Sequence, residues 1–177
     1  SVANYLDGYL TEYNVIDGQS RSPFAFGNFN SYGVWAPVRY SGSYGTNGFY
    51  LPFITNSQAY TGFLGSSQYL SVSSATTSIG TGDFTFECYV NPTTWPTYAP
   101  IIIADAVGGF YVGKNGSNFV LRAASSADLL LTATLPTTGQ WTHVAVTRSG
   151  GTAYIFYNGK LITSGSVTQN FATGTTY

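Results

Sequence analysis

The chain alternates apolar and polar residues over short runs, and this period of two is typical of β-strands. The clearest run is Asp83–Val90, in which Phe84, Phe86, Cys88 and Val90 fall on one face. Glycine and proline recur too often for a long helix. Short alternating runs between turn residues predict an all-β sandwich. We expect strands near 69–72, 84–91, 101–105, 110–113, 119–123, 129–134, 141–148, 152–157 and 160–163.

The stretch 141–164 predicts three consecutive antiparallel strands. Asn158-Gly159 is a strong hairpin signal, because both residues accept the positive φ of a type I′ turn. Gly150-Gly151 marks the preceding connection. From the alternation, together with the family pattern described next, we expect a buried set made of Phe84, Phe86, Cys88, Val144, Val146, Ile155 and Leu161.

The same stretch reads W-x-H-V-A-V-T-R, then aromatics, then Y-N-G-K-L. It resembles the laminin-G-like branch of the concanavalin A-like lectin/glucanase superfamily. Residues 65–90 add to the resemblance, since the family has a strand ending in Y-L-x-V followed by G-x-F-T-x-E-x-W-V; here Tyr89 stands where the family usually has Trp. The resemblance covers a predicted domain over 60–177 and implies an antiparallel jelly-roll β-sandwich. It sets no function, because this fold carries many unrelated sites.

Residues 20–59 are rich in glycine, serine and aromatics and form a predicted connector. Their sequence motifs F-G-x-F and G-V-W-x-P-x-x-Y-x-G-x-Y resemble those of a connector found beside laminin-G-like domains in tail and fibre proteins of bacteriophages. Such aromatic density is unsuited to a solvated linker. We expect the connector to pack on a domain or on a neighbouring chain.

Residues 1–19 resemble the closing strand of a laminin-G-like domain, although they precede the connector. Residues 170–177 stop where that strand should follow. Since an open sheet edge is a liability, we expect residues 8–16 to fill the gap, with Tyr9, Tyr13 and Val15 against the core. Three arrangements remain open: a circularly permuted single chain, a strand donated between chains, or one period of a tandem array cut out of phase.

The amino-acid composition indicates the kind of environment in which the protein is found. Only 7% of residues are charged, against about 25% in an ordinary soluble domain, and 17% are aromatic. We therefore expect a virion or extracellular protein. The net charge of −1 without a basic cluster argues against nucleic acid, and no apolar run is long enough to span a membrane. The N-terminus has no signal-peptide pattern, which suggests a mature form, a fragment or release by lysis.

The candidate catalytic residues are few. Cys88 is the only cysteine and is expected to be a small buried hydrophobe. His143, the only histidine, is interpreted as structural, since no nucleophile or orienting partner is suggested nearby. Glucanases of the resembled fold carry E-x-D-x-x-E, which is absent here. Asp83 and Glu87 share a strand face but would lie roughly 13 Å apart, too far for either glycosidase geometry. We expect no enzyme activity.

Calcium is the metal that the resemblance implies, and it takes about six to eight oxygen ligands. Asp17, Asp105 and Asp128 are the candidate ligands, but no loop is dense in acids. We therefore expect no cofactor, with calcium as the alternative.

A glycan site would need an exposed aromatic platform beside amides. Trp95 lies in a loop with two prolines, and Tyr98, Tyr111 and Asn115 are expected at the same end. The alternative is that Trp95 packs down on the sandwich.

These observations favour a non-enzymatic structural or adhesion module of a bacteriophage tail or fibre, or of another extracellular fibre. Its expected partners are further copies of itself, neighbouring subunits and a host surface glycan. A free carbohydrate-binding lectin is the first alternative. A divergent glycosidase is the second, and the missing carboxylate pair disfavours it.

Overall fold

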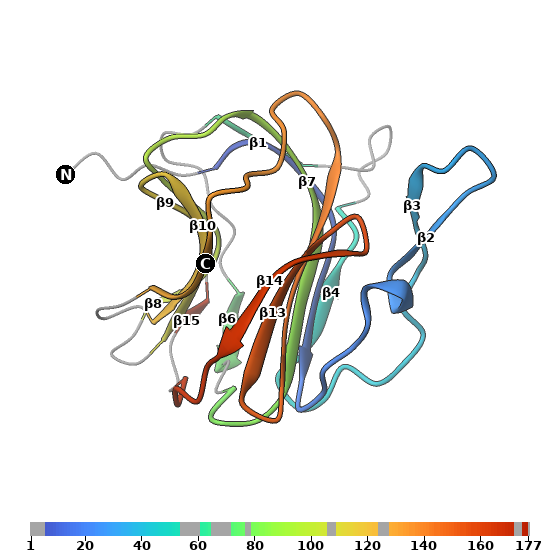
Figure 1. The fold of residues 1–177 in the computed structure, drawn as a ribbon. Coiled ribbons are helices and arrows are strands. Elements are labelled where there is room, and N and C mark those ends of the chain that lie inside the picture. Colours follow the sequence, from blue (N-terminus) through green and yellow to red (C-terminus); the bar gives the residue numbers. More distant parts are fainter. Residues whose placement is uncertain are drawn as a thin grey trace.

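The computed structural model describes residues 6–53, 61–64, 72–76, 79–105, 109–123, 128–171 and 175–176. Within these residues two antiparallel sheets face each other, and a small hairpin stands beside them (Figure 1). The only helical element in this part of the chain is a single 3-10 turn, η1 (Pro23–Ala25), and no helix there is long and apolar enough to cross a membrane. The predicted all-β antiparallel sandwich is confirmed.

The first sheet has seven strands, with β5 (Thr61–Leu64) pairing with β1 beside β4. Its order is β14 (Lys160–Ser166), β13 (Thr152–Tyr157), β12 (Thr142–Ser149), β7 (Phe84–Thr94), β1 (Asp7–Asp17) and β4 (Phe49–Leu51). The second sheet runs β11 (Asp128–Thr132), β10 (Asn118–Ala123), β9 (Phe110–Asn115), β8 (Tyr98–Asp105), β15 (Thr175–Thr176) and β6 (Val72–Thr76). The small hairpin is β2 (Gly27–Phe29) and β3 (Trp35–Pro37).

The predicted hairpin at Asn158-Gly159 is confirmed. The two residues join β13 to β14 with φ values of 48° and 74°, the positive values that a type I′ turn requires.

The main core lies between the two sheets and follows the predicted alternation. Phe84, Phe86, Cys88 and Val90 of β7 are buried. They pack in one cluster with side chains of β8, β9, β10, β12 and β13, which include Ile102, Phe110, Val112, Phe119, Leu121, Val144, Val146 and Ile155. Burial raises the pKa of the Cys88 thiol, so it stays protonated and acts as a small hydrophobe.

The prediction for Leu161 was wrong, because its side chain is 49% exposed. The pairing of β13 with β14 shifts by one residue between Ile155 and Phe156. Ile162 therefore turns toward the core, and Leu161 lies on the outer face opposite Phe156.

Truncating Phe86 to alanine is expected to lower the free energy of unfolding by about 3–5 kcal/mol, the usual cost for a core phenylalanine. Phe86 is 2% exposed, and the Tyr13 ring packs against it at 5.2 Å. Urea unfolding measures the loss. Leu161→Ala, a truncation at an exposed site, is the control and should stay within about 0.5 kcal/mol. Equal midpoints for the two variants would contradict the core assignment.

Strand β1 occupies an interior place in the first sheet. It pairs with β7 along one edge and with β4 and β5 along the other. Of the three arrangements that the sequence leaves open, this is the one in which a single chain completes its own sandwich. Tyr13 and Val15 lie in the core as expected.

The prediction that Tyr9 lies against the core was wrong. Its side chain is 40% exposed and contacts Trp141. A β-bulge explains the difference. Glu12 has a φ of 50°, and Glu12 and Tyr13 together oppose the single residue Cys88 between two regular stretches of pairing. The bulge changes which face each residue occupies, so that Leu10 faces the core before it.

The connector lies against the outer face of the first sheet (Figure 1). Ile16, on the outer face of β1, is buried in a second cluster with Phe26 and Tyr40 of the connector. The expectation that the connector packs on a domain is thus confirmed for residues 20–53, whereas residues 54–60 lie outside the described part.

Candidate functional site

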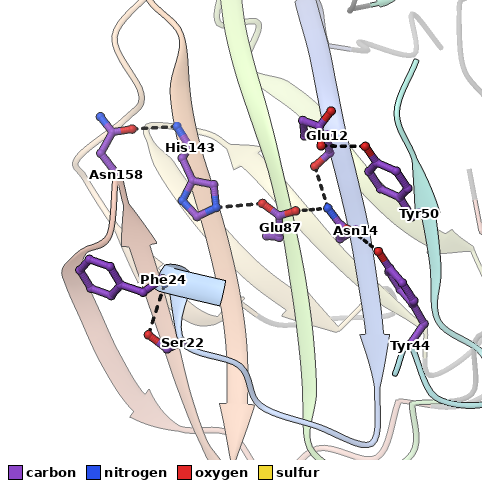
Figure 2. A network of polar contacts seen from close by, with 9 residues as sticks. All are labelled: Glu12, Asn14, Ser22, Phe24, Tyr44, Tyr50, Glu87, His143 and Asn158. Atoms are coloured by element: carbon purple, nitrogen blue, oxygen red, sulfur yellow. Dashed lines mark hydrogen bonds and ion pairs between the residues drawn. The ribbon is translucent and has the colours of Figure 1, made fainter. Parts of the chain in front are cut away.

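A row of polar side chains crosses the outer face of the first sheet beneath the connector (Figure 2). His143 comes from β12, Glu87 from β7 and Asn14 from β1. His143 is directly opposite Tyr89, and Glu87 is directly opposite Ala145. His143 and Glu87 are therefore diagonal neighbours, a separation that long side chains can bridge.

Hydrogen bonds join these residues into one network (Figure 2). His143 Nε2 lies 2.8 Å from Glu87 Oε2, and the Asn14 amide donates to the other oxygen of Glu87. The Tyr44 hydroxyl donates to Asn14 Oδ1 at 3.0 Å. The carboxyl group of Glu87 is therefore held from both sides.

The network continues toward β4 and toward the β13–β14 turn. The Tyr50 hydroxyl donates to Glu12 Oε2 at 2.7 Å, and Asn14 Nδ2 also donates to the Glu12 carbonyl. At the other end, the His143 N–H donates to Asn158 Oδ1 at 2.8 Å and the Asn158 N–H donates to the His143 carbonyl at 2.9 Å. These bonds fix the backbone of His143.

Trp35 of the connector closes the network. Its ring lies 5.4 Å from the His143 ring, while Tyr89 lies 5.1 Å from His143. Glycines let the chain approach the indole: a Cβ on Gly27 or on Gly159 would come within 2.4 Å of it. Under this cover the exposed fractions of His143 and Glu87 are 0% and 1%.

Burial sets the protonation of the pair. It is the main cause that raises the pKa of Glu87; the Asn14 hydrogen bond opposes it and the charge of Glu12 adds to it. Burial also lowers the pKa of His143 to about 3. Burial therefore favours the neutral form of both groups.

A carboxyl–imidazole pair can exchange a proton with a substrate only when the substrate reaches it. Here Trp35 covers the imidazole, and His143 Nδ1 is buried without a hydrogen-bond partner. The network stabilises the contact between sheet and connector.

Glu87→Gln is expected to become more stable relative to the unmodified protein as the pH rises from 5 to 8. Glutamine donates and accepts as the protonated carboxyl does. Folded Glu87 binds its proton more tightly than unfolded Glu87, whose pKa is about 4.3. The unmodified protein therefore loses stability as the pH rises from the unfolded pKa of Glu87 towards its raised folded pKa. The Glu87→Gln variant has no carboxyl group to ionise and keeps its stability over this range.

His143 contributes with the opposite sign. Its folded pKa of about 3 lies below the unfolded value of about 6.5, so its contribution is lost as the pH falls through that window. Above about pH 6.5, Glu87 alone makes the stability depend on pH. Unfolding free energies measured in urea at each pH separate the contribution of Glu87 from that of His143. Parallel pH curves for the two proteins would contradict a raised Glu87 pKa.

A family model described as the concanavalin A-like lectin/glucanases superfamily matches residues 64–177, which is more than half of the chain. The chain belongs to the concanavalin A-like lectin/glucanase superfamily. No curated protein and no solved structure matches it.

The superfamily match does not extend to β1 or to the connector. Asn14, Tyr44 and Trp35 therefore come from outside the matched region, whereas Glu87 and His143 come from inside it. The part of the chain before the match closes the outer face of a superfamily sheet.

The predicted glycan residues of this superfamily domain come together only in part. Tyr98 of β8 stacks on Tyr111 of β9 at 4.8 Å, and Asn115 pairs directly with Tyr98 across the strands. The Asn115 amide donates to both carboxylate oxygens of Asp128, which also pairs with Arg122 at 3.5 Å. Tyr111 is itself buried, so Tyr98 is the more accessible ring of the two.

Trp95 does not join them as an exposed platform. Its indole N–H donates to the Pro136 carbonyl at 2.8 Å, and its ring packs edge-on against Phe119 at 6.4 Å. Trp95 therefore covers the edge of the core, which is the alternative weighed from the sequence.

The predicted calcium ligands are engaged elsewhere or lie outside the description. Asp17 accepts from the backbone and side-chain nitrogens of Asn47 at 3.2 and 2.9 Å, and Asp128 is held by Asn115 and Arg122. The side chain of Asp105 is not among the described ones. Among the described residues no three His, Cys, Asp or Glu side chains gather to hold a metal ion.

Proposed function

We propose that this domain is a non-enzymatic structural or adhesion module of an extracellular assembly such as a viral tail or fibre. The superfamily is compatible with a carbohydrate-binding or structural module. A chain with 7% charged residues is soluble through hydroxyl and amide groups, a composition suited to a virion or to the outside of a cell.

One observation carries the proposal. The buried acid–imidazole pair of the described residues is sealed by the chain's own connector, with Trp35 over His143. A hydrolase needs its carboxyl groups within reach of substrate. Glu87 is instead used to attach the connector to the sheet, which favours a structural role.

Incubation with a panel of β-glucans, peptidoglycan and bacterial surface polysaccharides tests this. We expect no release of reducing sugar above background, and no difference between the unmodified protein and Glu87→Gln. Turnover that Glu87→Gln abolishes would show that the outer face opens and that the protein is an enzyme.

A second candidate, a glycan-binding lectin, is supported by the polar cluster on the second sheet. Tyr98 offers an aromatic ring beside Asn115, Asp128 and Arg122, which are the kinds of group that orient a sugar. A glycan array probed with the unmodified protein and with Tyr98→Ala tests it. Signals that Tyr98→Ala removes without a change in thermal stability would favour the lectin. Equal arrays would disfavour it.

A further inference from the structure

Two exposed aromatic side chains lie side by side on the outer face of the first sheet. Tyr9 belongs to β1, and Trp141 directly precedes β12. Their exposed fractions are 40% and 41%, and their ring centroids are 6.5 Å apart with an angle of 45° between the ring planes. Because the two rings contact each other, they form one surface.

Strand pairing places an amide between the two rings. Tyr9 is directly opposite Asn91 of β7. Thr142 is opposite Val90, so the preceding Trp141 falls beside Asn91 on its other side. We call Tyr9, Asn91 and Trp141 the aromatic row. None of the residues that the structure describes hydrogen-bonds to the side-chain amide of Asn91, which therefore keeps its donors and its acceptor for a ligand.

A carboxylate lies next to the aromatic row. Leu6 and Leu10 face the core, so Asp7, which alternates with them as Tyr9 does, lies on the outer face. The Thr94 hydroxyl donates to Asp7 Oδ2 at 3.0 Å. An ionised carboxylate has about four acceptor positions and no donor, so Asp7 can accept further hydrogen bonds from a ligand.

The backbone beneath the aromatic row is closely packed. Gly8 precedes Tyr9, and a Cβ at Gly8 would overlap the carbonyl oxygen of Asn91, so glycine is needed for β1 to approach β7 here. The Gly139 N–H donates to the Pro92 carbonyl at 2.8 Å and ties the segment that leads into β12 to β7. Groups held in place in this way lose less entropy when they bind a ligand.

Strand β1 contributes part of the site from outside the superfamily match. Tyr9 and Asp7 precede residue 64, where that match begins, whereas Asn91 and Trp141 lie within it. His143, two residues after Trp141, is covered by Trp35 of the connector. The aromatic row is therefore the first row of the outer face beyond the covered one.

We propose that the aromatic row binds a neutral carbohydrate. This inference rests on the adhesion role in the proposed function, and it names a surface on the opposite sheet from the Tyr98 cluster. The C–H groups on one face of a sugar ring carry partial positive charge and pack on the negative face of an aromatic ring. The sugar hydroxyls then bond to the Asn91 amide and donate to the Asp7 carboxylate.

Asp7 favours a carbohydrate over the other ligand that packs on paired aromatic rings, a proline-rich peptide. Such a peptide offers mainly carbonyl oxygens, because proline has no backbone N–H, and a carboxylate cannot donate to them. Sugar hydroxyls can donate to it. The negative charge of Asp7 also repels acidic sugars, so the favoured ligand is neutral.

Isothermal titration calorimetry of the full chain tests the proposal. The neutral probes are a β-glucan, a mannan and dextran; polygalacturonate is the acidic probe and poly-L-proline the peptide probe. We expect at least one neutral polysaccharide to bind. Tyr9→Ala and Trp141→Ala should each weaken that binding roughly tenfold, because each removes one of the two rings. Tyr98→Ala, which removes an aromatic ring from the second sheet, is the matched control and should bind as the unmodified protein does.

Oxidation by N-bromosuccinimide, followed by peptide mass mapping, is a second measurement that needs no variant. The polysaccharide that binds should slow the oxidation of Trp141 in the unmodified protein. It should not slow that of Trp95, which lies at the edge of the core. If a variant unfolds, this comparison decides, and equal rates for Trp141 with and without the polysaccharide would reject the site.

The proposal is also wrong if no neutral polysaccharide binds, if folded Trp141→Ala binds as the unmodified protein does, or if only polygalacturonate or poly-L-proline binds. The proposed function fails by a different result. Turnover that Glu87→Gln abolishes would reject the non-enzymatic role while the aromatic row still bound its ligand. An inactive protein that binds no probe would reject the carbohydrate site and leave the structural role standing.

Discussion

Deleting residues 1–17 is expected to abolish cooperative folding. The deletion removes β1 from between β7 and the β4–β5 edge, and with it Leu10, Tyr13 and Val15 of the core and Asn14 of the polar network. Large-to-small changes at single core positions already cost about 2–5 kcal/mol. Three such losses sum to roughly 6–15 kcal/mol, which is comparable to the roughly 5–15 kcal/mol that typically stabilises a whole domain.

Circular dichroism and thermal unfolding measure this loss. A synthetic peptide of residues 6–18 added in excess should restore part of the structure, because it supplies the strand that pairs with β7, β4 and β5. A peptide of the same composition in scrambled order is the control. A deletion variant that keeps a cooperative transition at the original temperature would show that β1 is not part of the sandwich.

Replacing Arg148 by methionine is expected to cost about 3–5 kcal/mol, a loss comparable to breaking a buried ionic contact. Arg148 is fully buried, and its guanidinium donates to the carbonyls of Gly80, Gly82 and Gln169. It also lies 5.1 and 5.0 Å from the rings of Phe84 and Phe171. The Gly80 carbonyl also accepts from the Phe171 N–H, whereas the Gly82 and Gln169 carbonyls lose the Arg148 donors, and a buried carbonyl without a donor costs about 1–3 kcal/mol.

Urea unfolding of Arg148→Met against Arg122→Met gives a matched comparison. Arg122 forms a partly exposed ion pair with Asp128, and such pairs contribute about 0–1 kcal/mol. Arg148→Lys should fall between the two, since a single ammonium group has fewer donors than the guanidinium fork. If Arg148→Met were as stable as Arg122→Met, the cation would not link the loops at that end of the sandwich.

The strands of the second half of the chain were predictable from local signals. Alternation in Phe84–Val90 and the Asn158-Gly159 turn act over a few residues, so they identify strands and one hairpin directly. The place of residues 8–16 as a strand of the sandwich was predictable only from their resemblance to a closing strand of the family.

The β-bulges were not predictable. Glu12 takes a positive φ. This conformation is uncommon for a non-glycine residue, and tertiary contacts are needed to stabilise it. No local pattern therefore signalled that Tyr9 and Tyr13 would face opposite sides. The same holds for Leu161, whose orientation depends on a register shift within β13 and β14.

The polar network was missed because it depends on long-range pairing. Glu87 and His143 are 56 positions apart, and their contact follows from the register of β7 with β12. Tyr89 and Ala145 lie beside them on the outer face. Apolar side chains at these positions were the one sequence signal that the outer face is covered. Recognising Trp35 as the cover required knowing where the connector folds.

Carbethoxylation of His143 tests the closed outer face most directly, because His143 is the only histidine in the chain and is neutral at pH 7. Burial under Trp35 and the contact of Nε2 with Glu87 keep the reagent from its ring nitrogens. Peptide mass mapping after reaction near neutral pH should find His143 unmodified in the native protein. It should find His143 modified in Trp35→Ala and in the denatured chain. Modification of His143 in the native protein at the rate of an exposed histidine would contradict the closed face.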